Sequence, residues 1–348
     1  MTQTTDLIPL QVLKAETDLP AEKIPPKVGD FLQKLGVPTL VSVAGRDPSR
    51  TRVVTTLLHG NEPSGLHAVH GWLRSGELPA VNVLFFIGAV RTALVPPGFA
   101  HRFLPGRIDL NRCWRGPMTG RTGVFAAEVL RQIRATRPEG LIDIHNNTGH
   151  SPAYGVGPAS GPEELKLAAL FADRFVRNDL ALGTLVEATR DDFPSVTVEC
   201  GRAGDEVANA NARTGLERYL TIDDIGTSPI ANRPMAVYVD PVRVEVRNGV
   251  ELAFGESRVL EADFTVARDI DRHNFELIDA GTPIGWIAPE IDRPLVALGH
   301  THEDLADDYF AIRNGVVETT QSLIPIMMTT NRRNALDDCL FYAVRREG

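Results

Sequence analysis

The sequence predicts an α/β protein, in which a sheet covered by helices on both faces is followed by a smaller β-rich domain. Residues 53–58 and 81–87 are continuous runs of apolar and β-branched residues, which is typical of strands buried on both faces. Segments with helical spacing alternate with such runs up to about residue 221. This alternation is the pattern of an α/β sheet with helices on either side.

Local composition gives the order of the elements. Residues 1–26 end in a cluster of prolines and are expected to form an extended arm or an edge strand. Gly36 closes the first helix, and Leu66, Val69 and Trp72 give the helix after the central strand its apolar spacing. The predicted elements are helices at 27–36, 64–75, 123–136, 162–177 and about 205–221, strands at 39–44, 53–58, 81–87, 140–145, near 183–188 and at 195–200, and a loop rich in Pro and Gly at about 95–122.

The chain changes character after about residue 226. From Ala236 onward the sequence predicts short strands and many turns, and the pairs Asn248-Gly249 and Asn314-Gly315 are hairpin signals. We therefore divide the chain into a larger domain with an N-terminal arm over residues 1–226 and a β-rich domain over residues 227–348.

Composition limits the classes of function. With 348 residues, 43% of them hydrophobic and 23% charged, the chain is typical of a soluble protein with a substantial core. The net charge of −9 argues against a nucleic-acid partner, and the sequence has no run of about 18 apolar residues that would span a membrane. Three separated cysteines without a CxxC pair, and an N-terminus without signal-peptide features, predict a cytoplasmic protein. A homo-oligomer is compatible with this composition.

The candidate chemistry begins at His59-Gly-Asn-Glu62, directly after the central strand. The rigid strand fixes the position of the residues that follow it, and the glycine lets the chain turn. An imidazole and a carboxylate on one tight turn can bind a single Zn²⁺ ion. His59 and Glu62 are therefore candidate metal ligands, and a third ligand must come from elsewhere in the chain.

His145 is the candidate for the third ligand, because it ends the strand at 140–145 much as His59 follows its own strand. In an open α/β sheet, ligands collect beyond the carboxyl ends of the strands. Asp143 lies two residues earlier on the same face of the strand, where it could orient His145. Two histidines and one glutamate leave the fourth position of a zinc ion open for water, which is the pattern of a catalytic site with one Zn²⁺ per chain.

A zinc hydrolase also needs a proton carrier, and Glu199 is the candidate because it lies at the end of an otherwise apolar strand. A carboxylate there costs free energy unless it is paired or has a chemical role. The alternative for Glu199 is a salt bridge at the rim of the sheet.

Polar residues suited to a carboxylate-bearing substrate lie between and beside these motifs. Asn111 and Arg112 offer an amide and a bidentate guanidinium, Arg102 could stabilise an oxyanion, and Arg190 is a further candidate for a carboxylate clamp. Seen alone, each arginine is expected to be a solvated surface residue.

Other histidines are expected to have less specific roles. His67 and His70 lie on the helix after the ligand turn and are expected to be structural. His300 and His302 form an HxH pair that could hold a second metal, but no third partner is evident, so a solvent-facing or substrate-lining loop is favoured.

Four motifs together carry a resemblance to a known family. HGNE (59–62), DLNR (109–112), DIHNNTG (143–149) and VTVECG (196–201) occur in the order expected of the succinylglutamate desuccinylase/aspartoacylase family, a branch of the zinc carboxypeptidase-like enzymes. The motifs span about residues 59–201, and the family's two-domain layout covers nearly the whole chain. The resemblance implies a mixed central sheet flanked by helices and a smaller C-terminal β-rich domain.

The resemblance also implies roles for individual residues. It implies that His59, Glu62 and His145 are the zinc ligands. It further implies that Glu199 is the catalytic carboxylate and that Arg102 is an oxyanion partner. The substrate contacts that it implies are Asn111, Arg112, Arg190 and Asn146. The substrate-binding tyrosine that aspartoacylases supply from their C-terminal domain has no match here.

The leading hypothesis is a zinc-dependent amidohydrolase that cleaves the linear amide of a small N-acyl amino acid or a related carboxylate-bearing amide. One alternative is a carboxypeptidase-like peptidase. Another is a non-catalytic zinc-binding sensor of small molecules, although such a protein is expected to have lost Glu199, which is present.

Overall fold

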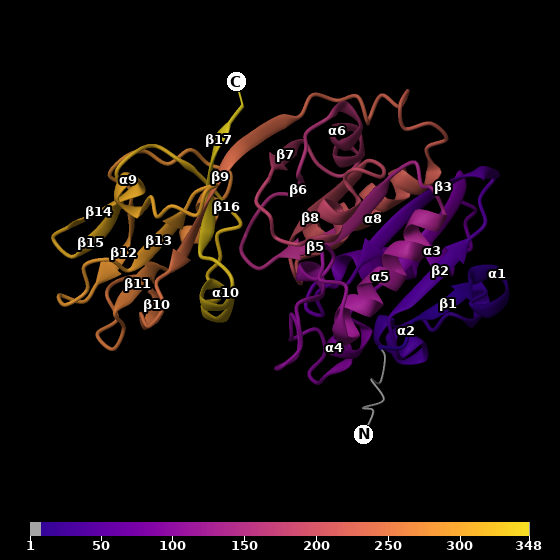
Figure 1. Ribbon diagram of the computed structural model, residues 1–348, viewed down its shortest axis with the longest axis horizontal. Coiled ribbons are helices and arrows are strands. Elements are labelled where there is room, and N and C mark those ends of the chain that lie inside the picture. The colour runs from indigo at the N-terminus through magenta and orange to yellow at the C-terminus, as the bar shows by residue number, and fades with distance from the viewer. Residues whose placement is uncertain (1–7, 348) are drawn as a thin grey trace. The chain divides into compact units, whose positions relative to one another are not determined.

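The computed structural model describes residues 8–347, which form two compact units (Figure 1). The first unit comprises residues 8–146 and 153–235, and the second comprises residues 147–152 and 236–347. The domain limits given above remain a prediction, and residues 1–7 of the predicted arm lie outside the described residues. None of the described helices is both long and apolar enough to cross a membrane.

The first unit is built on a mixed sheet, as the family resemblance implies. Its strands are β1 (Gln11–Lys14), β2 (Thr39–Val43), β3 (Asp47–Thr56), β4 (Val81–Ile87), β5 (Leu141–Asn147), β6 (Tyr154–Gly157), β7 (Arg174–Arg177) and β8 (Ser195–Arg202). They lie in the order β1-β2-β4-β3-β5-β8-β6-β7. β3 is parallel to β4 and β5, whereas β2 is antiparallel to β4, and β6 is antiparallel to β8. β1 lies at one end of this order, which confirms an edge strand in the N-terminal segment.

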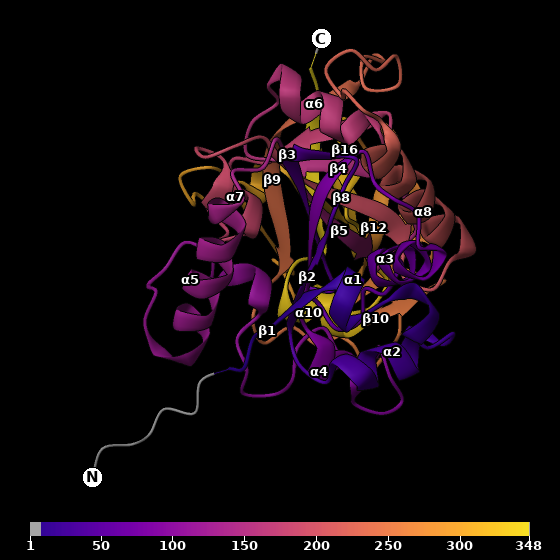
Figure 2. The ribbon, with the colours of Figure 1, turned by 90° about the vertical axis from the view of Figure 1, so that its right-hand side faces the viewer.

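Helices cover both faces of this sheet. They are α1 (Ala15–Asp18), α2 (Val28–Leu35), α3 (Ser64–Ser75), α4 (Val90–Leu94), α5 (Gly120–Ala135), α6 (Pro162–Ala169), α7 (Leu185–Thr189) and α8 (Glu206–Thr221), with short 3₁₀ turns at Ala21–Lys23 and Leu110–Arg112. Figure 2 shows α5 on one side of the central strands and α3 and α8 on the other.

Two separate cores follow from the alternation of side chains along each strand. Val53 and Leu141 pack with the apolar face of α5, whereas their neighbours Val54 and Ile142 pack with α3 and α8. Burying a side chain of this size contributes about 1.5–3 kcal/mol, so the two cores together hold the central strands firmly. The polar residues that follow these strands therefore have fixed starting points.

Two predicted elements of the first unit are wrong. The helix expected at 162–177 ends at Ala169, and Phe175 enters the sheet in β7, where its ring packs over Gly155 of β6. The strand expected near 183–188 is instead the short helix α7, because Thr184 caps it and accepts a hydrogen bond from the Glu187 N–H. A contact from outside the local segment thus decides the structure at β7, whereas at α7 the deciding contact is the local cap.

The second unit is β-rich, as predicted. β9 (Ala236–Val246) pairs with β13 (Leu295–Leu298) and with β17 (Phe341–Arg346), which pairs with β16 (Ile324–Ile326). A second sheet has the order β10-β11-β12-β15-β14, formed by β10 (Leu252–Gly255), β11 (Phe264–Ala267), β12 (Pro283–Ile287), β15 (Val316–Thr319) and β14 (Phe310–Arg313). Short helices lie at α9 (Ala306–Tyr309), α10 (Arg332–Asp337) and the 3₁₀ turn Ile270–His273.

The two Asn-Gly turns of this unit have different outcomes. Asn314-Gly315 joins the antiparallel strands β14 and β15, which confirms that hairpin. Gly249 also has a positive φ, but it joins β9 and β10, which belong to different sheets, so no hairpin forms there. The segment Asn147–Pro152 belongs to this unit as well, since the His150 N–H donates to Asp271 Oδ2 at 2.9 Å.

Candidate metal and catalytic site

The ligand turn follows β3 and ends where α3 begins at Ser64. Gly60 lies in this turn against a neighbouring loop, and its N–H donates to the Arg102 carbonyl at 3.0 Å. A Cβ at this glycine would come within 2.7 Å of the His101 carbonyl oxygen and 2.6 Å of Thr92 Cγ2. Only a residue without a side chain therefore fits, and the close packing fixes the turn.

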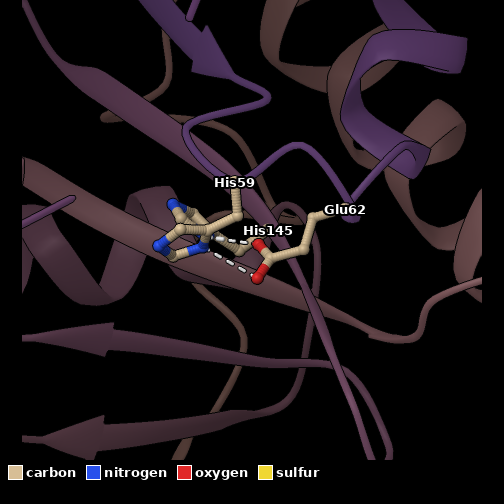
Figure 3. A group of neighbouring side chains, drawn as sticks. All are labelled: His59, Glu62 and His145. Atoms are coloured by element: carbon tan, nitrogen blue, oxygen red, sulfur yellow. Dashed lines mark hydrogen bonds and ion pairs between the residues drawn. The ribbon is translucent and has the colours of Figure 1, made fainter. Parts of the chain in front are cut away.

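The structure brings His59, Glu62 and His145 together in one buried group (Figure 3). Nδ1 of His59 lies 2.8 Å from Glu62 Oε1, and Nδ1 of His145 lies 2.6 Å from Glu62 Oε2. His59 and Glu62 come from one turn and His145 from β5, the parallel neighbour of β3. The predicted convergence at the carboxyl ends of two strands is thus present in the fold.

The second nitrogen of each ring faces a further carboxylate. Nε2 of His59 lies 2.9 Å from Asp109 Oδ1, and Nε2 of His145 lies 2.8 Å from Asp143 Oδ2. Asp143 is itself held by Thr55, whose hydroxyl donates to Oδ1 at 2.6 Å. Each Nε2–H thus has an acceptor, which leaves Nδ1 of both rings directed at Glu62.

This donor set fits a zinc ion. A neutral imidazole Nδ1 and a carboxylate oxygen both present lone pairs, so a positive ion must lie between them when they approach this closely, either a proton or a metal. Two imidazoles and one carboxylate are ligands that zinc prefers, and carboxylates behind the imidazoles are the usual support of such ligands. Among the described residues this is the one group of three or more metal-type side chains close enough to share an ion.

The charges in the group act strongly on one another. Burial alone would raise the pKa of Glu62, but His59 and His145 lower it well below its usual range. Burial alone would lower the pKa of His145, but the carboxylates of Asp143 and Glu62 raise it well above its ordinary value. The site therefore favours positive charge beside the carboxylate of Glu62.

Glu199 lies in β8 and is buried, with its Oε2 lacking a hydrogen-bond partner among the described residues. Burial, joined by the negative charge of Glu62, raises its pKa from 4.5 to about 7, although His145 and two other cationic groups oppose the rise. The rim salt bridge considered for this residue does not form with any of residues 8–347. A carboxyl group with this pKa can accept and release a proton near neutral pH.

Asp109 organises the loop that carries the predicted substrate residues. Its Oδ2 accepts a hydrogen bond from Arg102 Nε at 3.0 Å. Its Oδ1 accepts the Asn111 N–H at 2.8 Å and is also the oxygen that lies 2.9 Å from Nε2 of His59. Nη1 of Arg102 also lies 3.7 Å from Glu62 Oε1, and Nη1 of Arg112 donates to the Asn111 carbonyl at 2.9 Å. Arg102 and Asn111 are thus joined through one carboxylate to the candidate metal-binding group of His59, Glu62 and His145, called the metal group below.

The remaining predicted site residues are placed differently. Asn146 is buried, and its side chain accepts the Ser64 N–H at 3.0 Å and donates to Ser64 Oγ at 2.9 Å and to the Gly201 carbonyl at 3.0 Å. Arg190 is exposed, and its Nε lies 3.5 Å from Asp191 Oδ1. The described contacts do not join Arg190 to the metal group, and its predicted role stays a prediction.

Sequence reasoning missed Asp109 as a separate contributor, although it begins the DLNR motif. The signal that could have found it is an acidic residue two positions before Asn111 in a loop already assigned to the site. Of the other histidines, the buried His70 pairs with the Pro25 carbonyl at 2.8 Å, as expected of a structural residue. His302 lies on an exposed loop of the second unit.

The fold of this chain, a mixed α/β sheet with a smaller β-rich unit, is similar to that of solved structures of the succinylglutamate desuccinylase/aspartoacylase family. Three solved structures illustrate the likeness. A succinylglutamate desuccinylase/aspartoacylase from Rhodobacter sphaeroides is 16% identical, with a TM-score of 0.58 over 89% of this chain and 88% of that chain. A succinylglutamate desuccinylase from Vibrio parahaemolyticus is 12% identical, with a TM-score of 0.59 over 94% and 97%. Murine aminoacylase 3 is 16% identical, with a TM-score of 0.53 over 87% and 97%.

These identities are low, so the likeness concerns the fold. The resemblance inferred from the four motifs is confirmed at that level. No family model and no curated protein sequence matches the chain.

Proposed function

We propose that the protein is a zinc-dependent amidohydrolase that cleaves the linear amide bond of a small N-acyl amino acid or a related carboxylate-bearing amide. The observation that carries this proposal is the buried group of His59, Glu62 and His145, together with the buried carboxyl group of Glu199. The names of the structural neighbours, which include desuccinylases and an aminoacylase, support an N-acylated amino acid as the substrate class.

The metal would be held by Nδ1 of the two histidines and by the Glu62 carboxylate, and Asp109 and Asp143 would fix the orientation of the rings. When bound, zinc lowers the pKa of a water molecule to about 7 and polarises a substrate carbonyl. The chain's own residues then have to move protons and hold the substrate.

Glu199 is assigned the proton transfers. A water oxygen forms a bond to the amide carbon, and Glu199 takes the proton that this water loses. The same carboxyl group then donates the proton to the leaving nitrogen as the carbon–nitrogen bond breaks, which yields a carboxylic acid and a free amine. In the metal-free site, burial raises the pKa of Glu199 to about 7, and a carboxyl group with a raised pKa is suited to take up and release a proton.

Cationic and amide side chains are assigned to the negative charges of the substrate. Arg102, which Asp109 holds beside Glu62, would stabilise the oxyanion that forms during attack. Asn111 and Arg112 would contact the substrate carboxylate, with Arg190 as a further contact. Asn146, expected from the resemblance to bind substrate, has its side chain hydrogen-bonded to Ser64 and Gly201, which supports a role in holding the site together.

Metal analysis followed by a hydrolysis screen over N-acyl amino acids tests the proposal. His59→Ala should lose both zinc and activity, whereas the control His67→Ala, at an exposed position on α3, should keep both. Glu199→Gln should bind zinc and lose turnover. Normal zinc content in His59→Ala would overturn the ligand assignment, and full activity in Glu199→Gln would overturn the role of the base.

Two results of the same screen would favour the alternative functions. Release of the C-terminal residue from longer peptides would favour a peptidase. Bound zinc without turnover of any amide or ester would favour a non-catalytic binding protein.

A further inference from the structure

Two loops that are distant in sequence are joined beside the predicted substrate residues. The Trp114 N–H donates to the Gly183 carbonyl at 3.1 Å, and the Leu185 N–H donates to Asn111 Oδ1 at 3.0 Å. A Cβ at Gly183 would come within 2.8 Å of the Arg112 carbonyl oxygen, so the two backbones are in close contact. The position of Asn111 and Arg112 thus depends on the segment just before α7.

The contact with Leu185 fixes which end of the Asn111 amide is available. A backbone N–H requires an acceptor, so Oδ1 must face Leu185 and the donor Nδ2 must face the other way. Nδ2 lies 3.5 Å from Nε2 of His145, a distance too long for a good hydrogen bond, and that ring nitrogen already faces Asp143. Asn111 therefore presents an N–H donor on the side of the metal group, which suits a carboxylate.

A buried carboxylate holds the loop that makes this contact. Glu187 Oε1 accepts the Leu182 N–H at 3.0 Å, and Oε2 accepts the Gly183 N–H at 3.0 Å. Oε1 also accepts the Thr184 hydroxyl at 3.2 Å. The Glu187 side chain is 6% exposed. Arg115, in the loop that carries Asn111 and Arg112, places its Nη1 3.8 Å from Glu187 Oε2. Both oxygens of Glu187 are thus used to shape the turn that ends at Leu185.

We propose that Glu187 is a positioning residue for substrate recognition, which acts by holding Asn111 with its amide donor turned toward the substrate carboxylate. The inference rests on the proposed function, because it assigns Asn111 to a carboxylate of the substrate. Loss of Glu187 should affect substrate binding and not the chemical step. The described contacts of Glu187 are with the loop at 182–184 and with Arg115, and none is with the metal group.

Kinetics of Glu187→Gln on N-succinyl-L-glutamate and N-acetyl-L-glutamate test this role. Glutamine places an NH₂ group against one of the two backbone N–H donors, so the loop should shift and the hydrogen bond through Asn111 should weaken. The Michaelis constant should rise about tenfold or more, as for loss of a hydrogen bond to a charged group, with kcat changed much less. Zinc content should be unchanged. The preference for each acid over the same compound with its α-carboxylate converted to an amide should fall.

A double-mutant cycle separates this role from general structural support. In an Asn111→Ala background, Glu187→Gln should have little further effect on the Michaelis constant. An equal effect of Glu187→Gln on the Michaelis constant in both backgrounds would overturn the inference, and so would an unchanged Michaelis constant in the single variant. In either case, turnover by the unaltered protein would leave the proposed function intact. Absence of turnover by the unaltered protein would overturn both. Asp192→Asn, which removes a charge paired with Arg134, is the control and should leave the kinetics unchanged.

A second variant tests the contact directly if Glu187→Gln fails to fold. Leu185 is the first residue of α7, where proline is compatible with a helix, so Leu185→Pro removes the N–H donated to Asn111. Leu185→Ala keeps this N–H and removes more of the buried side chain. A higher Michaelis constant in the proline variant than in the alanine variant is expected, and equal constants would overturn the proposal.

Discussion

Glu199→Gln should make the metal-free protein more stable at alkaline pH, although it should abolish turnover. The Glu199 carboxyl group is buried, and its pKa is raised from 4.5 to about 7, mainly by burial. A carboxyl group with a higher pKa in the folded state holds its proton more tightly when folded. The free energy of unfolding should therefore fall as the pH rises from about 4.5 to about 7, and stay reduced above that.

The size of this effect follows from the pKa. Each unit of difference between the folded and unfolded states is worth about 1.4 kcal/mol, so a rise from 4.5 to about 7 costs the folded protein about 3 kcal/mol once both states are ionised. Glutamine does not ionise and has no such pH dependence. The stability difference between Glu199→Gln and the unaltered protein should therefore change by about 2–3 kcal/mol between pH 5 and pH 8.

Urea unfolding of both proteins in the presence of a chelator, at several pH values, measures this difference. Titrating groups that do not interact with Glu199 are shared by the two proteins and cancel in the comparison. Glu163→Gln, which removes an exposed charge paired with Lys166, is the control and should show a nearly constant difference. A stability difference for Glu199→Gln that does not change with pH would refute the reasoning, because it would mean that the buried carboxyl group has an ordinary pKa in the folded protein.

The other predictions concern the metal group and its support. Asp143→Asn should weaken zinc binding about 10- to 100-fold in a competition titration, because His145 loses the carboxylate that orients its ring; unchanged affinity would contradict this support. Gly60→Ala should destabilise the protein by about 1–3 kcal/mol in urea unfolding and reduce its zinc content, since its Cβ would overlap the His101 carbonyl, whereas Gly71→Ala, where a Cβ meets no atom, is the control. Zinc at a thousand times its dissociation constant should raise the free energy of unfolding by about 4 kcal/mol, and the loss of this gain in His59→Ala would identify the site as its source.

The convergence of the candidate ligands could be predicted because each depends on a local pattern and one general rule. The apolar run before His59 predicts a buried strand, and the same is true of the strand that ends at His145. β3 and β5 are parallel neighbours in the sheet, so their carboxyl ends meet at one edge, as the rule for α/β sheets requires. Glu199 follows from the same logic, since a carboxylate in an apolar strand is costly without a role.

The supporting contacts could not be predicted, because they depend on segments that meet only in the folded chain. Asn146 is hydrogen-bonded to Ser64, 82 positions away, so its motif alone gives no indication that its side chain is already used. Asp109 lies 50 positions from His59, and Leu185 lies 74 positions from Asn111. The same limit explains the error at β7, which pairs with β6, whereas α7 begins at a local cap, Thr184.

The balance of charge gives a further reason to expect a cation in this site. Four carboxyl groups, those of Glu62, Asp109, Asp143 and Glu199, are largely buried around two imidazoles and the guanidinium of Arg102. Carboxylates in a dry interior are stable only with nearby positive charge, and the arginines that act on this group are Arg102 and, at Asp109, Arg112. A proton on His145 can supply further positive charge, because the carboxylates of Asp143 and Glu62 raise its pKa. A divalent ion bound by the same Nδ1 atoms would supply two charges at once, so the surroundings of the ligands favour metal binding as much as the ligands do.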